Sequence, residues 1–303
     1  MLRQLFCALS ATAIVLVPAV ANAGAILGSI MPLGDSITYG EGVPGGYENQ
    51  LYLDLAGAGD SFTFVGSVDN NATSTLINAG DQYTEGHPGY RVDQIASNLF
   101  ADNDDSGGGD WLSGGGVSGR NPVYPNYVLL MAGINDMEQN YDPAYPSGNA
   151  PLATFMTDLE SRYTSLVDEL VVQRPTMQLI ISSVLPVVSG TDPTGGPVTT
   201  QEVVPFNAWL SNTLVPQFQA AGDAVTYVDT YDDFVNGQND DVVVDDFQSD
   251  GLHPSQGGYD TLGDSFASAI DALVPEPGSF GLFSAAGSIT LLRWRGRRIT
   301  KYR

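Results

Sequence analysis

The chain has 303 residues and a formal net charge of −24, and residues 25–274 alone contain 34 Asp and Glu against four Arg and no Lys. Such an acidic surface repels nucleic acids and anionic polymers and favours a neutral substrate or one reached in salty water, although most of these residues are expected to form only a solvated acidic shell. The only cysteine, Cys7, lies in the N-terminal segment, so the rest of the chain has neither a disulfide nor thiol chemistry.

The first 23 residues have the pattern of a secretory signal peptide. Arg3 precedes an apolar run over residues 5–20, and the segment ends in small residues at 21–23. A membrane anchor is the alternative, but Pro18 interrupts a run that is already short for a membrane span. We therefore expect export and cleavage after Ala23.

Residues 24–274 are expected to form one domain in which strands and helices alternate. Strands are predicted over residues 25–33, 62–65, 127–131, 177–183 and 224–229. Helices are predicted over residues 48–58, 152–173, 203–221 and 257–273, with a further helix after Arg91. This alternation is typical of a parallel sheet covered by helices on both faces.

Residues 30–40, reading IMPLGDSITYG, contain a candidate nucleophile. A buried strand that ends at Gly34 can turn sharply there, which places Ser36 at the carboxyl edge of the sheet. Backbone N–H groups at the start of the following helix would then face an oxyanion. An Asp or Ser that only caps a helix gives the same letters, so partners elsewhere in the chain must decide.

Two further segments provide donors at the same edge. Residues 85–95 read EGHPGYRVDQI, and Gly89 could lend an N–H to an oxyanion, although a plain turn is the alternative. Asn135 follows the apolar strand at 127–131, and its side-chain amide can donate where a carboxylate could not. A cap on the next helix is the other role open to this asparagine.

The hexapeptide SDGLHP, residues 249–254, contains a candidate base. His253 lies three residues after Asp250, and a turn at Gly251 would let the carboxylate reach the imidazole Nδ1. That contact would leave Nε2 free to take a proton from a serine. A turn-capping Asp250 beside a surface histidine is the alternative reading of this hexapeptide.

In this order, the four segments resemble the SGNH (GDSL) hydrolase superfamily, over residues 30–273. The resemblance implies an α/β fold, a flavodoxin-like three-layer α/β/α sandwich on a parallel five-stranded sheet with strand order 2-1-3-4-5. The segments MPLGDSITYG, EGHPGYRVDQI, VLLMAGINDM and DGLHPSQGGY are most similar to carbohydrate esterase family three, which includes acetyl xylan esterases. Ile134, where that group more often has Thr, and a long insertion at 101–126 leave the substrate open.

The resemblance also assigns roles. It makes Ser36 the nucleophile, His253 the base and Asp250 the acid that orients it. The oxyanion donors would be Gly89, Asn135 and the backbone N–H of the nucleophile, and no metal or cofactor is implied. His87 is a rival base, which we disfavour because it has no acid at an equally favourable spacing.

The insertion contains a run of acids at 102–110, reading DNDDSGGGD. Alternating carboxylates suggest calcium, but the spacing differs from that of an EF-hand loop and the closing Glu is absent. We therefore expect a plain surface insertion, with calcium as the alternative.

The C-terminal segment changes in character after residue 274. It reads VPEPG at 274–278, is mostly apolar and small over 279–292, and ends in the basic cluster RWRGRR at 293–298. It resembles the PEP-CTERM sorting signal of Gram-negative-type bacteria, which a membrane enzyme recognises and processes. The expected divisions are therefore a signal peptide (1–23), the hydrolase domain (24–274) and a sorting segment with transient or anchored membrane contact (275–303). A buried C-terminal helix is the alternative, disfavoured by the Arg cluster.

Together these features predict an exported serine esterase at the cell surface, outer envelope or extracellular matrix. Its expected substrate is an acetylated polysaccharide such as acetylated xylan, or a small ester, and it has no nucleic-acid partner. A lipid esterase or thioesterase of the same fold and a non-catalytic binding protein are the alternatives. The loops at 85–91, 137–150 and 191–197 are rich in Gly, Pro, Tyr and Asp, which favours a short acyl group over a long one.

Overall fold

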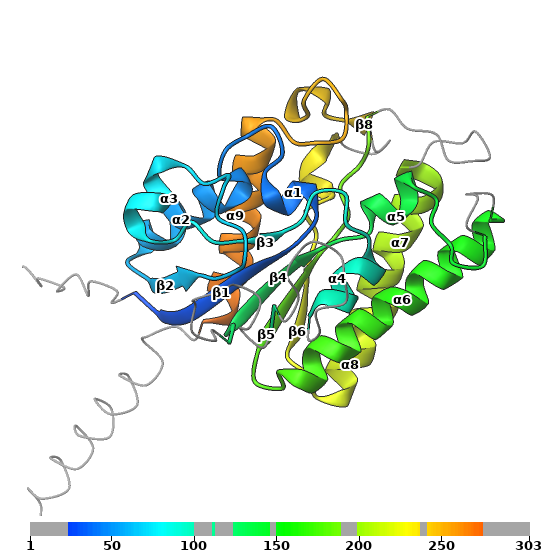
Figure 1. Ribbon diagram of the computed structural model, residues 1–303, viewed down its shortest axis with the longest axis horizontal. Helices are drawn as coiled ribbons and strands as arrows, with labels where there is room; N and C mark the ends of the chain where they lie inside the picture. Colours follow the sequence, from blue (N-terminus) through cyan, green and yellow to red (C-terminus); the bar gives the residue numbers. More distant parts are fainter. Residues whose placement is uncertain are drawn as a thin grey trace, which may run out of the picture. The chain divides into compact units, whose positions relative to one another are not determined.

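A parallel sheet forms the centre of the domain in the computed structural model (Figure 1). The structure describes residues 24–99, 111–112, 124–145, 150–188, 199–236 and 241–274. The main strands are β1 (Ile26–Gly34), β2 (Ser61–Phe64), β4 (Tyr127–Met131), β5 (Gln178–Ser182) and β6 (Val225–Val228). They lie in the order β2-β1-β4-β5-β6, all parallel, which is the order 2-1-3-4-5 that the family resemblance implies.

The sheet has a sixth strand that the sequence did not predict. β3 (Glu85–Gly86) pairs in parallel with the last two residues of β1, Leu33 and Gly34. The pairing of β2 with β1 ends at Ile30, so β3 continues the same side of β1 toward its carboxyl end. Two residues are too few for an alternating pattern, which is why this strand could not be predicted.

Helices cover both faces of the sheet. Figure 1 shows α2 (Gly46–Ala58) and α9 (Gln256–Leu273) on one side, and α4 (Val92–Asn98), α6 (Leu152–Gln173), α7 (Val204–Trp209) and α8 (Val215–Ala221) on the other. α2 and α9 pack closely because Gly263 has no side chain: a Cβ there would lie 2.8 Å from the Tyr47 carbonyl oxygen. This arrangement confirms the predicted three-layer sandwich.

One predicted helix begins at the end of a wider turn and contains a second one. The stretch predicted as a helix at 203–221 is helical throughout, but π-helical turns at Thr199–Val203 and Leu210–Leu214 precede α7 and α8. Pro205 and Pro216 follow these turns. A proline inside an α-helix clashes with the carbonyl four residues earlier, and a widened turn removes that conflict.

Two short helices, α3 (Ser74–Ala79) and α5 (Ile134–Glu138), were not predicted, and a third, α1 (Ser36–Tyr39), was expected after the turn at Gly34 but without bounds. Each has four to six residues, which is less than two turns and too short for a helical period to appear in the sequence. Two of them follow strands at the carboxyl edge of the sheet. A small antiparallel pair, β7 (Val235–Asn236) and β8 (Asp241–Val242), completes the strands that the structure describes.

Residues 24–275 form one compact unit. The predicted signal peptide at 1–23 and sorting segment at 275–303 lie outside the described residues, as do most of the insertion at 101–126 and the loop at 191–197. Within the described part of the chain, no helix has the length and apolarity needed to cross a membrane.

Candidate active site

Ser36 lies where β1 ends and α1 begins, at the carboxyl edge of the sheet (Figure 1). The turn requires glycine at position 34, because a Cβ there would lie 2.2 Å from the Met131 carbonyl oxygen of the neighbouring strand. Asp35 caps α1, since its carboxylate accepts the Ile37 N–H at 2.9 Å. The capping role therefore belongs to Asp35, and the Ser36 hydroxyl is free to take another partner.

That partner is His253. The distance from Ser36 Oγ to His253 Nε2 is 2.9 Å, and that from His253 Nδ1 to Asp250 Oδ2 is 2.8 Å. Gly251 has a φ of +71°, a left-handed conformation that suits glycine and brings the acid and the imidazole to the same side of the turn. The structure thus brings three of the predicted residues into one chain of hydrogen bonds, although two of them are 217 residues apart.

The charges along this series of hydrogen bonds favour proton transfer from Ser36 to His253. Partial burial opposes ionisation of Asp250, but hydrogen bonds from His253 and from the Leu252 N–H outweigh it and lower the pKa of the carboxyl. An ionised Asp250 can only accept, so the imidazole must donate its Nδ1–H to it. Nε2 then has its lone pair toward the Ser36 hydroxyl.

The buried carboxyl of Asp35 behaves differently from that of Asp250. Burial raises the pKa of Asp35 to about 7, although the Ile37 N–H and the nearby imidazole of His253 act in the opposite direction. Asp35 is therefore largely neutral below pH 7, whereas Asp250 is ionised. The two carboxyls beside the imidazole have distinct roles, one capping a helix and one orienting the ring.

Asn135 and the loop containing Gly89 lie against each other at the same edge. Asn135 Nδ2 donates to the Tyr90 carbonyl at 3.1 Å, which uses one of the two N–H bonds of the amide. Gly89 has a φ of +81°, and no atom lies within 4 Å of where its Cβ would be. The His87 N–H donates to the Gly34 carbonyl at 3.0 Å and so ties this loop to the end of β1, next to Ser36.

His87 has an acid partner, so our reason for disfavouring it was wrong. Its Nε2 lies 2.7 Å from Oε1 of the buried Glu85, two residues earlier. Its ring stacks on Trp111, with centroids 4.2 Å apart and planes at 7°, and on Tyr90 at 4.9 Å. The described contact of His87 Nε2 is with Glu85, while His253 holds the hydroxyl of Ser36.

Several residues that the sequence reasoning missed hold these groups in place. Asp136 accepts the Val92 N–H at 3.0 Å and forms a buried ion pair with Arg162. Burial raises the pKa of Asp136 to about 6, although Arg162 pulls it down. The amide of Gln248 donates to the Glu41 carbonyl at 2.7 Å and to the Pro254 carbonyl at 2.9 Å. The scarcity of Arg in this acidic domain is a signal that could have drawn attention to Arg162.

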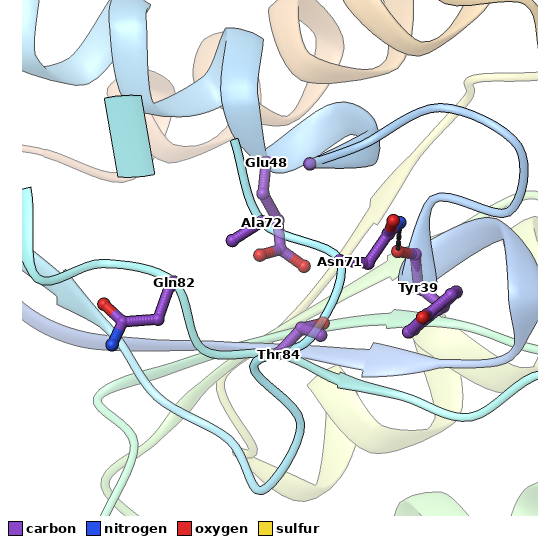
Figure 2. A pocket seen from close by; sticks show the side chains of 7 residues that line it. Tyr39, Glu48, Asn71, Ala72, Gln82 and Thr84 are labelled. Atoms are coloured by element: carbon purple, nitrogen blue, oxygen red, sulfur yellow. Dashed lines mark hydrogen bonds between the residues drawn. The ribbon is translucent and has the colours of Figure 1, made fainter. Parts of the chain in front are cut away.

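A small cavity lies next to Tyr39, the last residue of α1. Its volume is about 10 Å³, the size of one water molecule, and it is lined by residues from four segments: Tyr39, Gly45, Glu48, Asn71, Ala72, Gln82 and Thr84. Figure 2 shows the Glu48 carboxyl turned into this space. Burial raises the pKa of Glu48 to about 8, despite a hydrogen bond with Thr84. Glu48 is therefore mostly protonated at neutral pH.

Asn71 connects this cavity to the candidate nucleophile. Its Nδ2 donates to the carbonyls of Tyr39 and Gly40, at 2.8 and 2.9 Å, where α1 ends (Figure 2). Such bonds satisfy carbonyls that a helix end leaves without partners. The short helix that begins at Ser36 is thus capped at both ends, by Asp35 and by Asn71.

Among the described residues, no three His, Cys, Asp or Glu side chains are grouped so that they could hold a metal ion. The acidic run at 102–110, which we weighed for calcium, lies outside the described residues.

The fold and this edge of the sheet define a serine hydrolase of the α/β type, and comparison with known proteins agrees. Residues 33–261 match the GDSL-like lipase/acylhydrolase family, which is well over half of the chain. The chain therefore belongs to the GDSL-like lipase/acylhydrolase family, a family of serine ester hydrolases. The predicted superfamily and enzyme class are confirmed.

Solved structures and one curated relative are similar to the chain. A family 3 carbohydrate esterase of Clostridium thermocellum is 27% identical, with a TM-score of 0.57 over 82% of this chain and 97% of that one. A family 3 carbohydrate esterase of Talaromyces cellulolyticus, 20% identical, shares the fold with a TM-score of 0.55 over 81% and 97% of the two chains. A multidomain esterase of Ruminococcus flavefaciens is 24% identical over 275 residues, 87% of this chain, which spans 31% of that relative's length.

Proposed function

We propose that this protein is an exported esterase that removes acetyl groups from a polysaccharide. The observation that carries the proposal is the hydrogen-bonded chain from Ser36 through His253 to Asp250, within a domain of the GDSL-like lipase/acylhydrolase family. The similarity to the Clostridium thermocellum family 3 carbohydrate esterase supports the choice of a carbohydrate ester.

In this proposal Ser36 is the nucleophile. His253 Nε2 takes the hydroxyl proton as Oγ attacks the ester carbonyl carbon, and Asp250 stabilises the imidazolium that forms. The tetrahedral intermediate collapses when the sugar oxygen leaves and takes the proton from His253, which gives an acyl-Ser36 ester. Water then attacks that ester with His253 again as base, and releases acetate and free Ser36.

The oxyanion of each tetrahedral intermediate is held by three donors. We assign these to the backbone N–H groups of Ser36 and Gly89 and to the Asn135 amide. The Asn135 amide carries a second N–H besides the one bonded to the Tyr90 carbonyl, and we assign that second N–H to the oxyanion. Donors fixed before the reaction stabilise developing charge without reorganising, which is commonly a large part of catalysis.

The location of the protein is also part of the proposal. The segment at 1–23 would direct export, and the segment at 275–303 would be recognised and processed by a membrane enzyme, leaving the esterase at the cell surface, outer envelope or matrix. A strongly acidic domain repels anionic polymers, which fits a neutral, acetylated polymer as substrate.

The proposal predicts a short acyl preference. With p-nitrophenyl esters, kcat/KM should fall from acetyl to butyryl to octanoyl, because loops rich in Gly, Pro, Tyr and Asp provide little apolar surface for added methylenes, each worth about 0.8 kcal/mol when buried. The purified protein should release acetate from acetylated xylan. Ser36→Ala should lower both activities by about a thousandfold or more, with an unchanged melting temperature.

A rate that rises with acyl length, without acetate release from any polysaccharide, would favour a lipid esterase or thioesterase. Full activity in Ser36→Ala would remove the assigned nucleophile. A protein without activity on any ester would favour the non-catalytic binding alternative.

A further inference from the structure

Four hydrogen bonds join residues 89–92, which are the end of the Gly89 loop and the first residue of α4, to residues 135–139, which are most of α5 and the residue after it. Asn135 donates to the Tyr90 carbonyl at 3.1 Å, and the Gln139 amide donates to the Gly89 carbonyl at 3.0 Å. In the other direction, the Val92 N–H donates to Asp136 at 3.0 Å and Arg91 donates to Gln139 at 2.9 Å. Two of the three assigned oxyanion donors therefore belong to segments whose relative position depends on these bonds.

Asp136 has a special place among them because it joins three elements. One carboxylate oxygen accepts the Val92 N–H at the start of α4, and the other pairs with Arg162 of α6, while Asp136 itself belongs to α5. Its side chain is fully buried, whereas the side chain of Arg162 is 13% exposed. A buried carboxylate has few orientations open to it once both of its oxygens are bonded to different elements.

Arg162 is in turn held by contacts of its own. Its Nη2 donates to the Tyr141 carbonyl at 2.9 Å and its Nε to Asp158 at 2.6 Å. The ring of Tyr141 lies against both Arg162 and Arg91, at 5.2 and 3.7 Å from the guanidinium carbons. The domain has four arginines and no lysine, and two of these arginines, Arg91 and Arg162, lie against the ring of Tyr141.

We propose that Asp136, held by Arg162, is a positioning residue that fixes the Gly89 loop relative to Asn135 and so sets the geometry of the oxyanion site. The inference rests on the proposed function, because it assumes that Gly89 and Asn135 stabilise the oxyanion. Asp136 has no described contact with Ser36 or His253, so it acts through the two donors.

The matched pair of variants for the test is Asp136→Asn and Asp158→Asn. Both remove one carboxylate partner of Arg162 and keep the shape of the side chain. Only Asp136 also holds the Gly89 loop, whereas Asp158 is 28% exposed and lies one helical turn from Arg162 on α6. Arg162→Lys keeps the positive charge but has a single donor group in place of the planar fork, and tests the other half of the pair.

Asp136→Asn should lower kcat by about tenfold to a hundredfold, with KM changed by less than about twofold. Misplaced donors stabilise the transition state less and leave ground-state binding of the substrate intact. Its affinity for a boronic acid, which forms a tetrahedral adduct with serine, should fall by a similar factor. Arg162→Lys should give a smaller loss of the same kind. Asp158→Asn should stay within about twofold of the wild-type kcat.

Rates are counted per serine labelled by a fluorophosphonate probe, so that loss of folded protein does not imitate loss of positioning. The proposal is overturned if Asp136→Asn keeps kcat within about twofold per labelled serine, if only its KM rises, or if Asp158→Asn is equally impaired. The proposed function fails separately, through a Ser36→Ala variant that still hydrolyses the best ester. A dead Ser36→Ala variant beside an unchanged Asp136→Asn variant would reject the positioning role alone.

Discussion

Two histidines lie at the carboxyl edge of the sheet, and their bonding partners separate them. His253 contacts both the Ser36 hydroxyl and Asp250. His87 contacts Glu85 and is enclosed by two aromatic rings. A carboxylate beside an imidazole is therefore present at both sites, and the contact with the serine is what distinguishes a base from a structural histidine.

This difference can be tested with one substitution at each position. His253→Gln should lower kcat by about a thousandfold or more, because the amide cannot accept and return the serine proton. His87→Gln should keep kcat within about tenfold, since the amide can still bond Glu85 and fill most of the space beside Trp111. Steady-state kinetics on p-nitrophenyl acetate, with melting temperatures as the control for folding, would measure both. Equal losses in the two variants would reopen His87 as the base.

At the scale of the elements, the loop that carries His253 is attached to the one that follows Ser36 through Gln248. The amide of Gln248 bonds the Glu41 carbonyl after α1 and the Pro254 carbonyl in its own loop. Its backbone N–H also donates to the His253 carbonyl at 2.8 Å. One side chain thus joins the two loops whose ends must meet for the Ser36–His253 hydrogen bond.

Gln248→Leu keeps the side-chain volume but removes both amide bonds. We expect kcat to fall by about tenfold, because a small displacement of the imidazole weakens proton transfer. Gln256→Leu is the matched control, since Gln256 is exposed at the start of α9 and its amide bonds only Asp260, at 2.8 Å. The rate of serine labelling by a fluorophosphonate should change in the first variant and not in the second. A labelling rate that is equal in both would show that the loops are held by other contacts.

The sequence predicted the long elements well because each contains several periods of its pattern. β4 and α6 agree with the predicted residues 127–131 and 152–173 at both ends. α1 and α5, which position Ser36 and Asn135, are shorter than two turns; α5 was not predicted, and α1 was expected after the turn at Gly34 but without bounds. The helices that carry the candidate site residues are thus the ones that are too short to show a helical period in the sequence.

The candidate site shows a similar division. Ser36, Asp250 and His253 were predicted because short motifs surround them, and the structure brings them together. The pair of Glu85 and His87 was missed, although residues two apart in an extended segment point to the same face, which is a signal the sequence does contain. The pair of Asp136 and Arg162 could not be found, because it depends on how α5 and α6 pack.

At the scale of the whole molecule, several carboxyl groups are buried, and their hydrogen bonds and nearby charges do not fully offset the cost of burying the ionised form. Burial raises the pKa of Glu48 from 4.5 to about 8, that of Asp35 to about 7 and that of Asp136 to about 6. In each case the folded protein keeps a proton that the unfolded chain has already lost. The free energy of unfolding should therefore fall as the pH rises from the ordinary value of each group to its raised value.

Glu48→Gln tests the largest of these shifts. The variant should be more stable than the wild type at pH 8, and the difference should vanish toward pH 4.5, with a slope of at most about 1.4 kcal/mol for each pH unit between. Thermal melts at pH 5, 6.5 and 8 would measure it. Asp168→Asn, which removes a charge from an exposed position on α6, is the matched control. A Glu48→Gln variant that is less stable than the wild type at pH 8 would instead mean that the folded protein needs an ionised carboxylate in the cavity of Figure 2, for example to bind a cation.

The position of Ser36 directly after β1 has a consequence for how the protein loses activity. β1 is bonded to strands on both sides, so its amides should exchange with solvent only when the whole domain opens. His253 lies in a surface loop that is held by a few bonds, among them those of Gln248. We therefore expect the segment that carries His253 to open locally, while Ser36 stays next to a strand that is bonded on both sides. Esterase activity should therefore be lost at a lower denaturant concentration than the one that unfolds the sheet. Diluting the denaturant should restore activity as quickly as the loop closes.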